Sequence, residues 1–133
     1  MALGMSTTLR NNMLDAITSQ AGTSAKLRFY NGTRPATGGT ATTLLAELTC
    51  NATAFAPAAS TGIGGVLTLN SITSATASAG GTATWFRIVT SGGTFVVDGD
   101  VGTSGSDLNM SAVVFTSGAT IAVSAYTITA GNA

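Results

Sequence analysis

The sequence contains no histidine, a single cysteine, two prolines and very few charged residues. Only 8% of its 133 residues are charged, whereas about 25% is usual for a globular domain. Without histidine, the chain lacks the commonest general base, pH switch and transition-metal ligand. Cys50 has no partner for an intrachain disulfide or a zinc cluster, and its apolar neighbours indicate a buried side chain. We therefore expect a protein that is not an enzyme and that holds no cofactor.

An excess of charge of either sign is also missing. The five basic and five acidic side chains give a net charge of zero, so we expect neither nucleic acid nor an anionic membrane as a partner. Residues 1–66 hold four basic and two acidic side chains (+2), and residues 67–133 hold one basic and three acidic (−2). This weak polarity either suits head-to-tail contacts between copies or arises by chance. No apolar run is long enough to span a membrane, and we expect no secretory signal.

The spacing of apolar residues predicts one helix followed by strands. Leu9, Met13 and Ile17 recur at helical spacing between an N-cap at Ser6 or Thr7 and a stop at Gly22. From Ala25 onward the period changes to two, which predicts strands within residues 26–30, 44–50, 66–79, 83–90, 94–97, 110–115 and 120–129. We predict one domain over 1–133. An arm and amphipathic helix over 1–24 precede an all-β domain over 25–133, an antiparallel sandwich or barrel of about eight strands.

Three aspartates gather in one glycine-rich stretch and are the single candidate metal site. An EF-hand loop that began at Asp98 would need an oxygen ligand where Gly102 stands and a glycine where Thr103 stands, so that motif fails. A looser calcium site from Asp98, Asp100 and Asp107 is one hypothesis. The alternative, which we favour, is a hairpin with a polar loop whose aspartates face water and accept hydrogen bonds from loop amides.

Aromatic and basic side chains supply further candidates for an interface. Trp85 and Phe86 fall on opposite faces of one strand, so one enters the core and the other caps an edge or an interface. Arg87 shares the face of Trp85 and either joins that interface or lies along the ring. Arg28 and Arg34 flank a tyrosine and suit an anionic group. The interface candidates are Leu9, Met13, Ile17, Arg34, Trp85 and Arg87.

The order of segments carries a resemblance to a known group of proteins. A short amphipathic helix is followed by LRFYNGTRPATGGTATTLLAEL, then by ATWFRIVTSGGTFVVDGDVGTSGSDLNM, and last by AYTITAGN. This order resembles small virion structural proteins of tailed bacteriophages, and most of all a head decoration (cement) protein. The resemblance implies a β-rich viral protein, often a homotrimer, bound in many copies to the major capsid protein on the outside of the phage head. Such a protein is made in the host cytoplasm and stabilises the capsid lattice. No catalytic or binding residue is implied.

Two other functions remain open at the level of the sequence. A tail-tube, baseplate or fibre subunit of the same virion would share these features. A carbohydrate-binding module would instead use Trp85, Tyr30 or Tyr126. For a structural subunit, we expect residues 1–21 to form one contact surface, with the loops 33–42 and 54–65 as the next candidates.

Overall fold

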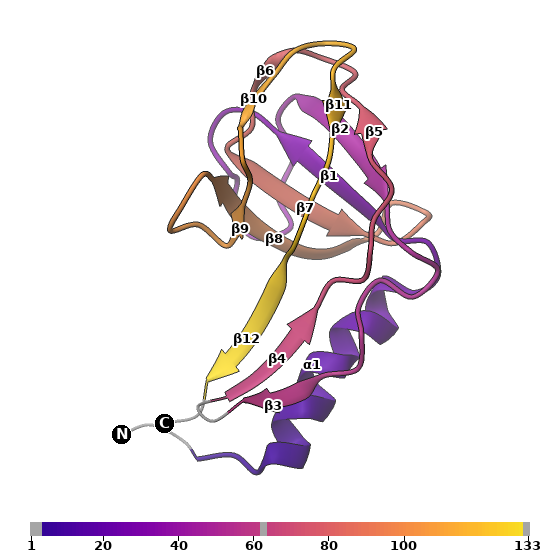
Figure 1. Ribbon diagram of the computed structural model, residues 1–133, viewed down its shortest axis with the longest axis vertical. Helices are drawn as coiled ribbons and strands as arrows, with labels where there is room; N and C mark the ends of the chain where they lie inside the picture. Colours follow the sequence, from indigo (N-terminus) through magenta and orange to yellow (C-terminus); the bar gives the residue numbers. More distant parts are fainter. Residues whose placement is uncertain (1–3, 62–63, 132–133) are drawn as a thin grey trace.

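One helix and twelve strands make up the chain in the residues that the structure, a computed structural model, describes: 4–61 and 64–131 (Figure 1). The helix is α1 (Thr7–Ala21). The strands are β1 (Lys26–Tyr30), β2 (Leu44–Thr49), β3 (Ala59–Thr61), β4 (Gly64–Thr68), β5 (Ala75–Thr76), β6 (Gly81–Thr82), β7 (Trp85–Val89), β8 (Phe95–Gly102), β9 (Leu108–Asn109), β10 (Val114–Phe115), β11 (Thr120–Ile121) and β12 (Thr127–Gly131). The prediction of an all-β protein with one N-terminal helix is confirmed.

Local signals in the sequence fix both ends of α1. The Ser6 hydroxyl accepts a hydrogen bond from the Leu9 amide at 3.2 Å, which satisfies one of the free N–H groups of the first turn. Gly22 has a φ of 70°, and its N–H donates to the Thr18 carbonyl at 3.1 Å. Both predicted ends of the helix are confirmed.

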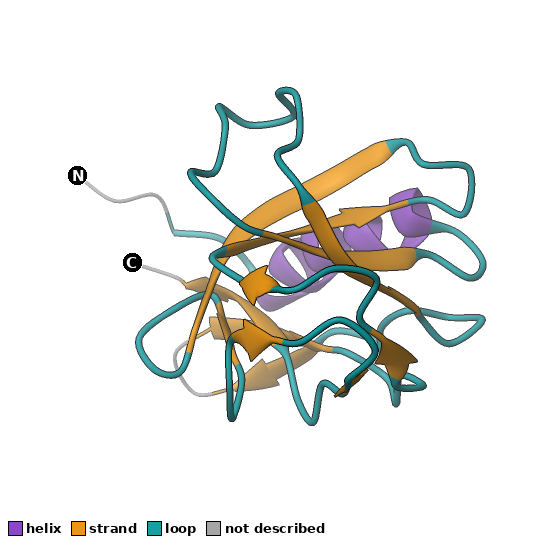
Figure 2. Cartoon of the chain, turned by 90° about the horizontal axis from the view of Figure 1, so that it is seen from above, coloured by secondary structure: helices purple, strands orange, loops and turns teal. Residues whose placement is uncertain are grey.

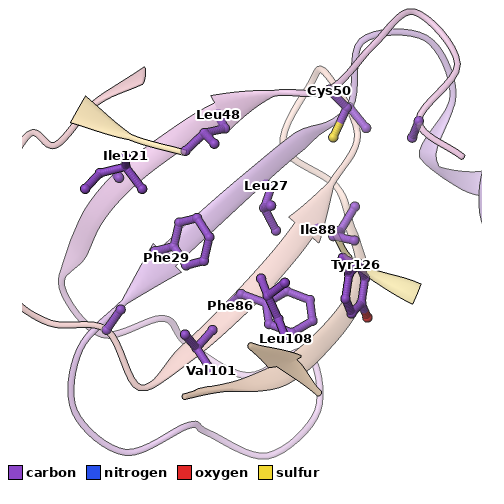
Figure 3. Close-up of a cluster of buried hydrophobic side chains, with 14 of the residues drawn as sticks. Leu27, Phe29, Leu48, Cys50, Phe86, Ile88, Val101, Leu108, Ile121 and Tyr126 are labelled. Carbon is purple, nitrogen blue, oxygen red and sulfur yellow. The ribbon is translucent and has the colours of Figure 1, made fainter. Parts of the chain in front are cut away.

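The largest sheet has five strands in the order β2-β1-β7-β8-β9. Leu27 and Phe29 of β1 face the core together with Phe86 and Ile88 of β7, because side chains alternate between the faces of a strand (Figure 3). Gly99 of β8 stands opposite Phe86, and a Cβ atom there would lie 2.5 Å from the Phe86 ring. The absence of a side chain at residue 99 therefore makes room for a core phenylalanine.

Two short ladders cover the core face of the five-stranded sheet. Strand β6 pairs with β10, and β5 pairs with β11. Phe115 of β10 meets Phe29 edge-on, with ring centroids 5.6 Å apart. Ile121 of β11 adds to the same cluster (Figure 3). Residues 77–80 join β5 to β6, and residues 116–119 join β10 to β11; Figure 2 shows the strands of the molecule joined by loops on its outside.

A separate three-stranded sheet in the order β12-β4-β3 carries the helix. Leu14 of α1 lies over Gly65 of β4, and the Asp15 carboxylate accepts the Ala58 amide at 2.7 Å just before β3. Figure 1 shows this sheet and α1 at the end of the molecule opposite the two short ladders. The helix thus docks on strands that lie more than 35 residues further along the chain.

The strands are more numerous than predicted and most are shorter, although β8 extends to Gly102 where a strand over 94–97 was predicted. The largest sheet is mixed because β9 pairs parallel with β8. The predicted strands 66–79 and 120–129 are each interrupted, because their ends pair in different ladders, β4 with β12 and β5 with β11. Beyond the first ladder, the backbone amide of Asn70 donates to the Ala54 carbonyl at 2.9 Å. The segment 54–65, predicted to be irregular, contains β3, which pairs with β4.

Candidate functional site

The outer face of the five-stranded sheet carries the charged and aromatic residues that the sequence singles out. Alternation along β7 places Trp85, Arg87 and Val89 on this face, and all three are nonetheless buried. The cover comes from the chain itself, since the segment 31–43 between β1 and β2 folds back over these side chains. We call residues 31–43 the covering loop.

A row of four charged side chains crosses the middle of this face. The register aligns Glu47, Arg28, Arg87 and Asp98 on neighbouring strands β2, β1, β7 and β8. Arg28 Nε and Glu47 Oε2 are 2.6 Å apart, as are Arg87 Nε and Asp98 Oδ1. The two guanidinium groups are therefore neighbours, and each is neutralised by a carboxylate on its far side.

Exposure separates the two ion pairs. The Arg28 and Glu47 side chains are 30% and 35% exposed, whereas those of Arg87 and Asp98 are 10% and 1% exposed. The hydrogen bond that Arg87 donates to Asp98 raises the pKa of Arg87 above its usual value, against burial and the neighbouring Arg28, which lower it. Pairing with Glu47 likewise raises the pKa of Arg28. Burial makes the Arg87–Asp98 pair the one whose disruption costs most.

Aromatic rings flank the row on both sides, with Trp85 and Tyr30 on one side and Phe95 on the other. Tyr30 and Trp85 stack with ring centroids 4.3 Å apart and planes inclined by 15°. The Arg87 guanidinium carbon lies 5.2 Å from the centroid of Trp85 and 5.2 Å from that of Phe95. A cation at this distance from a ring face is attracted by the ring quadrupole. The outer face is therefore a layer of stacked rings and paired charges.

Side chains of β7 and β8 hold the covering loop at its base and at its tip. At the base, Trp85 Nε1 donates to the Asn31 carbonyl at 3.1 Å and to the Thr42 hydroxyl at 3.0 Å. At the tip, the Gly38 amide donates to Asp98 Oδ2 at 3.1 Å, and Arg87 Nη2 donates to the Gly39 carbonyl at 2.8 Å. Sequence reasoning missed these loop partners, because nothing in a glycine pair shows which distant side chain it meets.

The structure corrects the expectation that Trp85 and Arg87 offer a surface to another subunit. Trp85 is fully buried and Arg87 is nearly so, because the covering loop lies over both. Arg87 does lie along the Trp85 ring, as the alternative interpretation stated. Tyr30 and Tyr126, the other rings named for carbohydrate stacking, are also buried. Among these rings there is no exposed platform for a sugar.

The three aspartates do not form a metal site. Asp98 and Asp100 lie within β8 and not in a loop. Asp98 forms an ion pair with Arg87, and Asp100 forms one with Arg34 at 3.2 Å. Asp107 lies beyond the opposite face of β8, and its Oδ2 accepts the Asp100 amide at 2.9 Å. Within residues 4–61 and 64–131, no three acidic, histidine or cysteine side chains are grouped to hold a metal ion. The candidate Arg34 is thus engaged at the surface and is set apart from Arg28.

The helix candidates share one stripe of α1 but differ in exposure. Arg10 and Leu14 are buried against the sheet, and Ile17 is half-buried and packs on the core cluster. Leu9 and Met13 remain 48% and 52% exposed. They are the large apolar side chains that α1 leaves accessible.

The open pockets and the single thiol offer little chemistry. The pocket beside β9 and β12 has a volume of about 290 Å³ and is lined by Asp107, Asn109, Ser124, Ala125, Tyr126 and Thr127. Burial and the neighbouring Asp107 raise the pKa of Tyr126 to about 12. Burial raises the pKa of Cys50 to about 11, although Lys26 lowers it. Neither group is poised for proton transfer near neutral pH.

No family model matches the chain, and no curated protein or solved structure matches it either. In the part of the chain that the structure describes, no helix is long and apolar enough to cross a membrane. A function must therefore be inferred from the chain's own residues.

Proposed function

We propose that this protein is a structural subunit of a bacteriophage virion, bound in many copies to the outside of the head as a decoration protein that stabilises the capsid lattice. The resemblance of its segment order to such proteins motivates the proposal. The observation that carries it is the pairing of charge. Three ion pairs engage six of the ten charged side chains with one another, and α1 exposes the apolar side chains of Leu9 and Met13.

A surface of this kind associates by burying apolar and small side chains. Leu9 and Met13 supply the largest exposed apolar groups of the helix, and each contributes up to about 1.5–3 kcal/mol when fully buried. Weak contacts of this size become stable when they are repeated over a lattice. Attraction between opposite charges contributes little to an interface of this kind. We therefore expect the affinity for the particle to change by less than about twofold between low and high salt, a range in which electrostatic attraction is strongly screened.

The decisive experiment counts bound copies per particle. Purified protein is mixed with heads that lack it and, separately, with isolated tails. Saturation on heads at a fixed number of copies per capsomer supports the proposal. Binding to tails alone would instead identify a tail-tube, baseplate or fibre subunit, and binding to neither would refute a structural role on the virion.

The helix surface is tested by a pair of double variants. Leu9→Asp with Met13→Asp places two charges in the apolar surface, and we expect it to weaken particle binding at least tenfold because those charges lose water on contact. Thr8→Asp with Asn12→Asp adds the same charge at exposed positions of α1 outside the apolar stripe. If the Leu9 and Met13 double variant binds particles as tightly as the Thr8 and Asn12 double variant, and both melt at the wild-type temperature, a role for Leu9 and Met13 is ruled out.

A further inference from the structure

The strand β12 ends the three-stranded sheet with an unpaired edge (Figure 1). The Leu69 amide donates to the Tyr126 carbonyl at 2.9 Å, so these two residues form a hydrogen-bonded pair at the start of the ladder. Because such pairs alternate along an antiparallel ladder, Ile128 bonds to β4. The N–H and C=O groups of Thr127 and Thr129 then point away from the sheet, and no other strand among the described residues pairs with them.

This edge lacks the devices that normally prevent pairing with another chain. Edge strands are usually blocked by charged side chains, by proline or by a bulge. The sequence of β12 is TITAG, without charge or proline, and its register with β4 runs without a shift. The strand is therefore competent to add another strand.

The exposed apolar residues of α1 lie on the same side of the molecule. Leu14 faces β4, and Asp15 lies on the β3 side, where its carboxylate accepts the Ala58 amide. Successive helical residues are rotated by about 100°, so Met13 lies about 100° from Leu14 in the opposite sense to Asp15, on the β12 side. Leu9, one turn earlier, shares that side. We call Leu9 and Met13 the apolar flank.

We propose that two copies of this chain pair through their β12 edges, antiparallel about a two-fold axis, to form one six-stranded sheet. The axis lies between the two β12 strands, so the helices on the two β4 strands are separated by three strand spacings, about 14 Å. Helices in direct contact are about 8–10 Å apart. The apolar flanks face each other across the axis and fill the remaining gap with the Leu9 and Met13 side chains of both copies.

Charge favours this symmetric pairing over a ring. In a two-fold contact the residues near the axis meet their own counterparts, so a charge there would be repelled by its copy in the partner. Neither β12 nor the apolar flank carries a charge. Pairing of β12 with the β3 edge of the next copy would instead bring the apolar flank against Asp15 and the polar side of the helix. The two-fold pair buries the same Leu9 and Met13 that the proposed function uses for particle binding, but it is tested on the isolated protein without a particle, and it differs from the trimer that the resemblance implies.

Light scattering and hydrogen exchange on the isolated protein test the pairing. We expect a species of twice the chain mass of 13.1 kDa that dissociates on dilution. In that species the outward amides of Thr127 and Thr129 exchange at least about tenfold more slowly than in the monomer. A monomer up to about 100 μM, near the weak limit of specific self-association, or a trimer, would overturn the proposal.

Two matched pairs of variants locate the contact. Thr129→Pro removes an outward N–H while leaving the bonds of Ile128 to β4, and proline is tolerated at a free edge. We expect it to weaken the dimer about tenfold or more, whereas Thr129→Val keeps the N–H and the dimer. Met13→Asp places two like charges at the axis and should also give a folded monomer. The control variant Asn12→Asp should remain a dimer. If Thr129→Pro fails to fold, the Met13 and Asn12 pair still decides. A dimer unaffected by Met13→Asp would refute the contact.

Discussion

Removal of the Asp98 carboxylate should destabilise the protein far more than removal of Glu47, although both carboxylates pair with an arginine at 2.6 Å. In Asp98→Ala, the Arg87 guanidinium stays buried without a counter-charge, which costs about 3–5 kcal/mol. In Glu47→Ala, the partner Arg28 is 30% exposed and water replaces the lost contact, so the cost is about 0–1 kcal/mol. The unfolding free energy of a domain is only about 5–15 kcal/mol in total.

Urea denaturation measures this difference. With a slope of about 2 kcal/mol per molar urea, the midpoint falls by about 2 M for Asp98→Ala and by less than about 0.5 M for Glu47→Ala. The double variant Arg87→Met with Asp98→Leu removes both charges and should recover most of the loss, because apolar residues replace a buried ion pair at little cost. Equal losses for the two single alanine variants, or a double variant less stable than Asp98→Ala, would refute the reasoning.

Two further predictions follow from the core. Gly99→Ala should lower the unfolding free energy by about 1–3 kcal/mol, because the added Cβ lies 2.5 Å from the Phe86 ring; Gly92→Ala, whose nearest neighbour would be 3.9 Å away, should change it by less than about 0.5 kcal/mol in the same denaturation assay. The thiol of Cys50 has a pKa of 9.0 when free and about 11 in the fold, and the phenol of Tyr126 has 10.0 and about 12. The unfolded chain therefore loses these protons first, and melting temperatures should fall as pH rises from 9 to 12. Cys50→Ala should delay the start of that fall to about pH 10, and a flat profile across this range would contradict the burial of both groups.

The elements that the sequence predicts correctly are those with local signals. The hydroxyl of Ser6 and the left-handed Gly22 define the helix without reference to the rest of the chain. Strands β1 and β7 are recognisable from their period of two. Leu27 and Phe29 in β1, and Phe86 and Ile88 in β7, alternate with residues that face the other side of the sheet. Short strands such as β9 and β10 carry no such pattern, since two residues cannot show a period.

The candidate site depended on contacts between distant residues, which the sequence does not show. Leu9 and Met13 have helical spacing, but so have Arg10 and Leu14, and only the position of the sheet decides which pair docks. Trp85 is buried by a loop that lies more than 40 residues earlier in the chain. The prediction that Asp98 lies in a solvated loop was wrong, because its partner Arg87 stands opposite it in the ladder.

The charged row across the sheet has a consequence for the order of assembly. Arg28 finds Glu47 within the hairpin of β1 and β2, and Arg87 finds Asp98 within the hairpin of β7 and β8. Each hairpin thus neutralises its own arginine through contacts that are local in sequence. β1 then pairs with β7 over a separation of more than 50 residues, and such long-range pairing is the slow step of folding. Because each hairpin is already electrically neutral, this step meets no net repulsion between the two guanidinium groups.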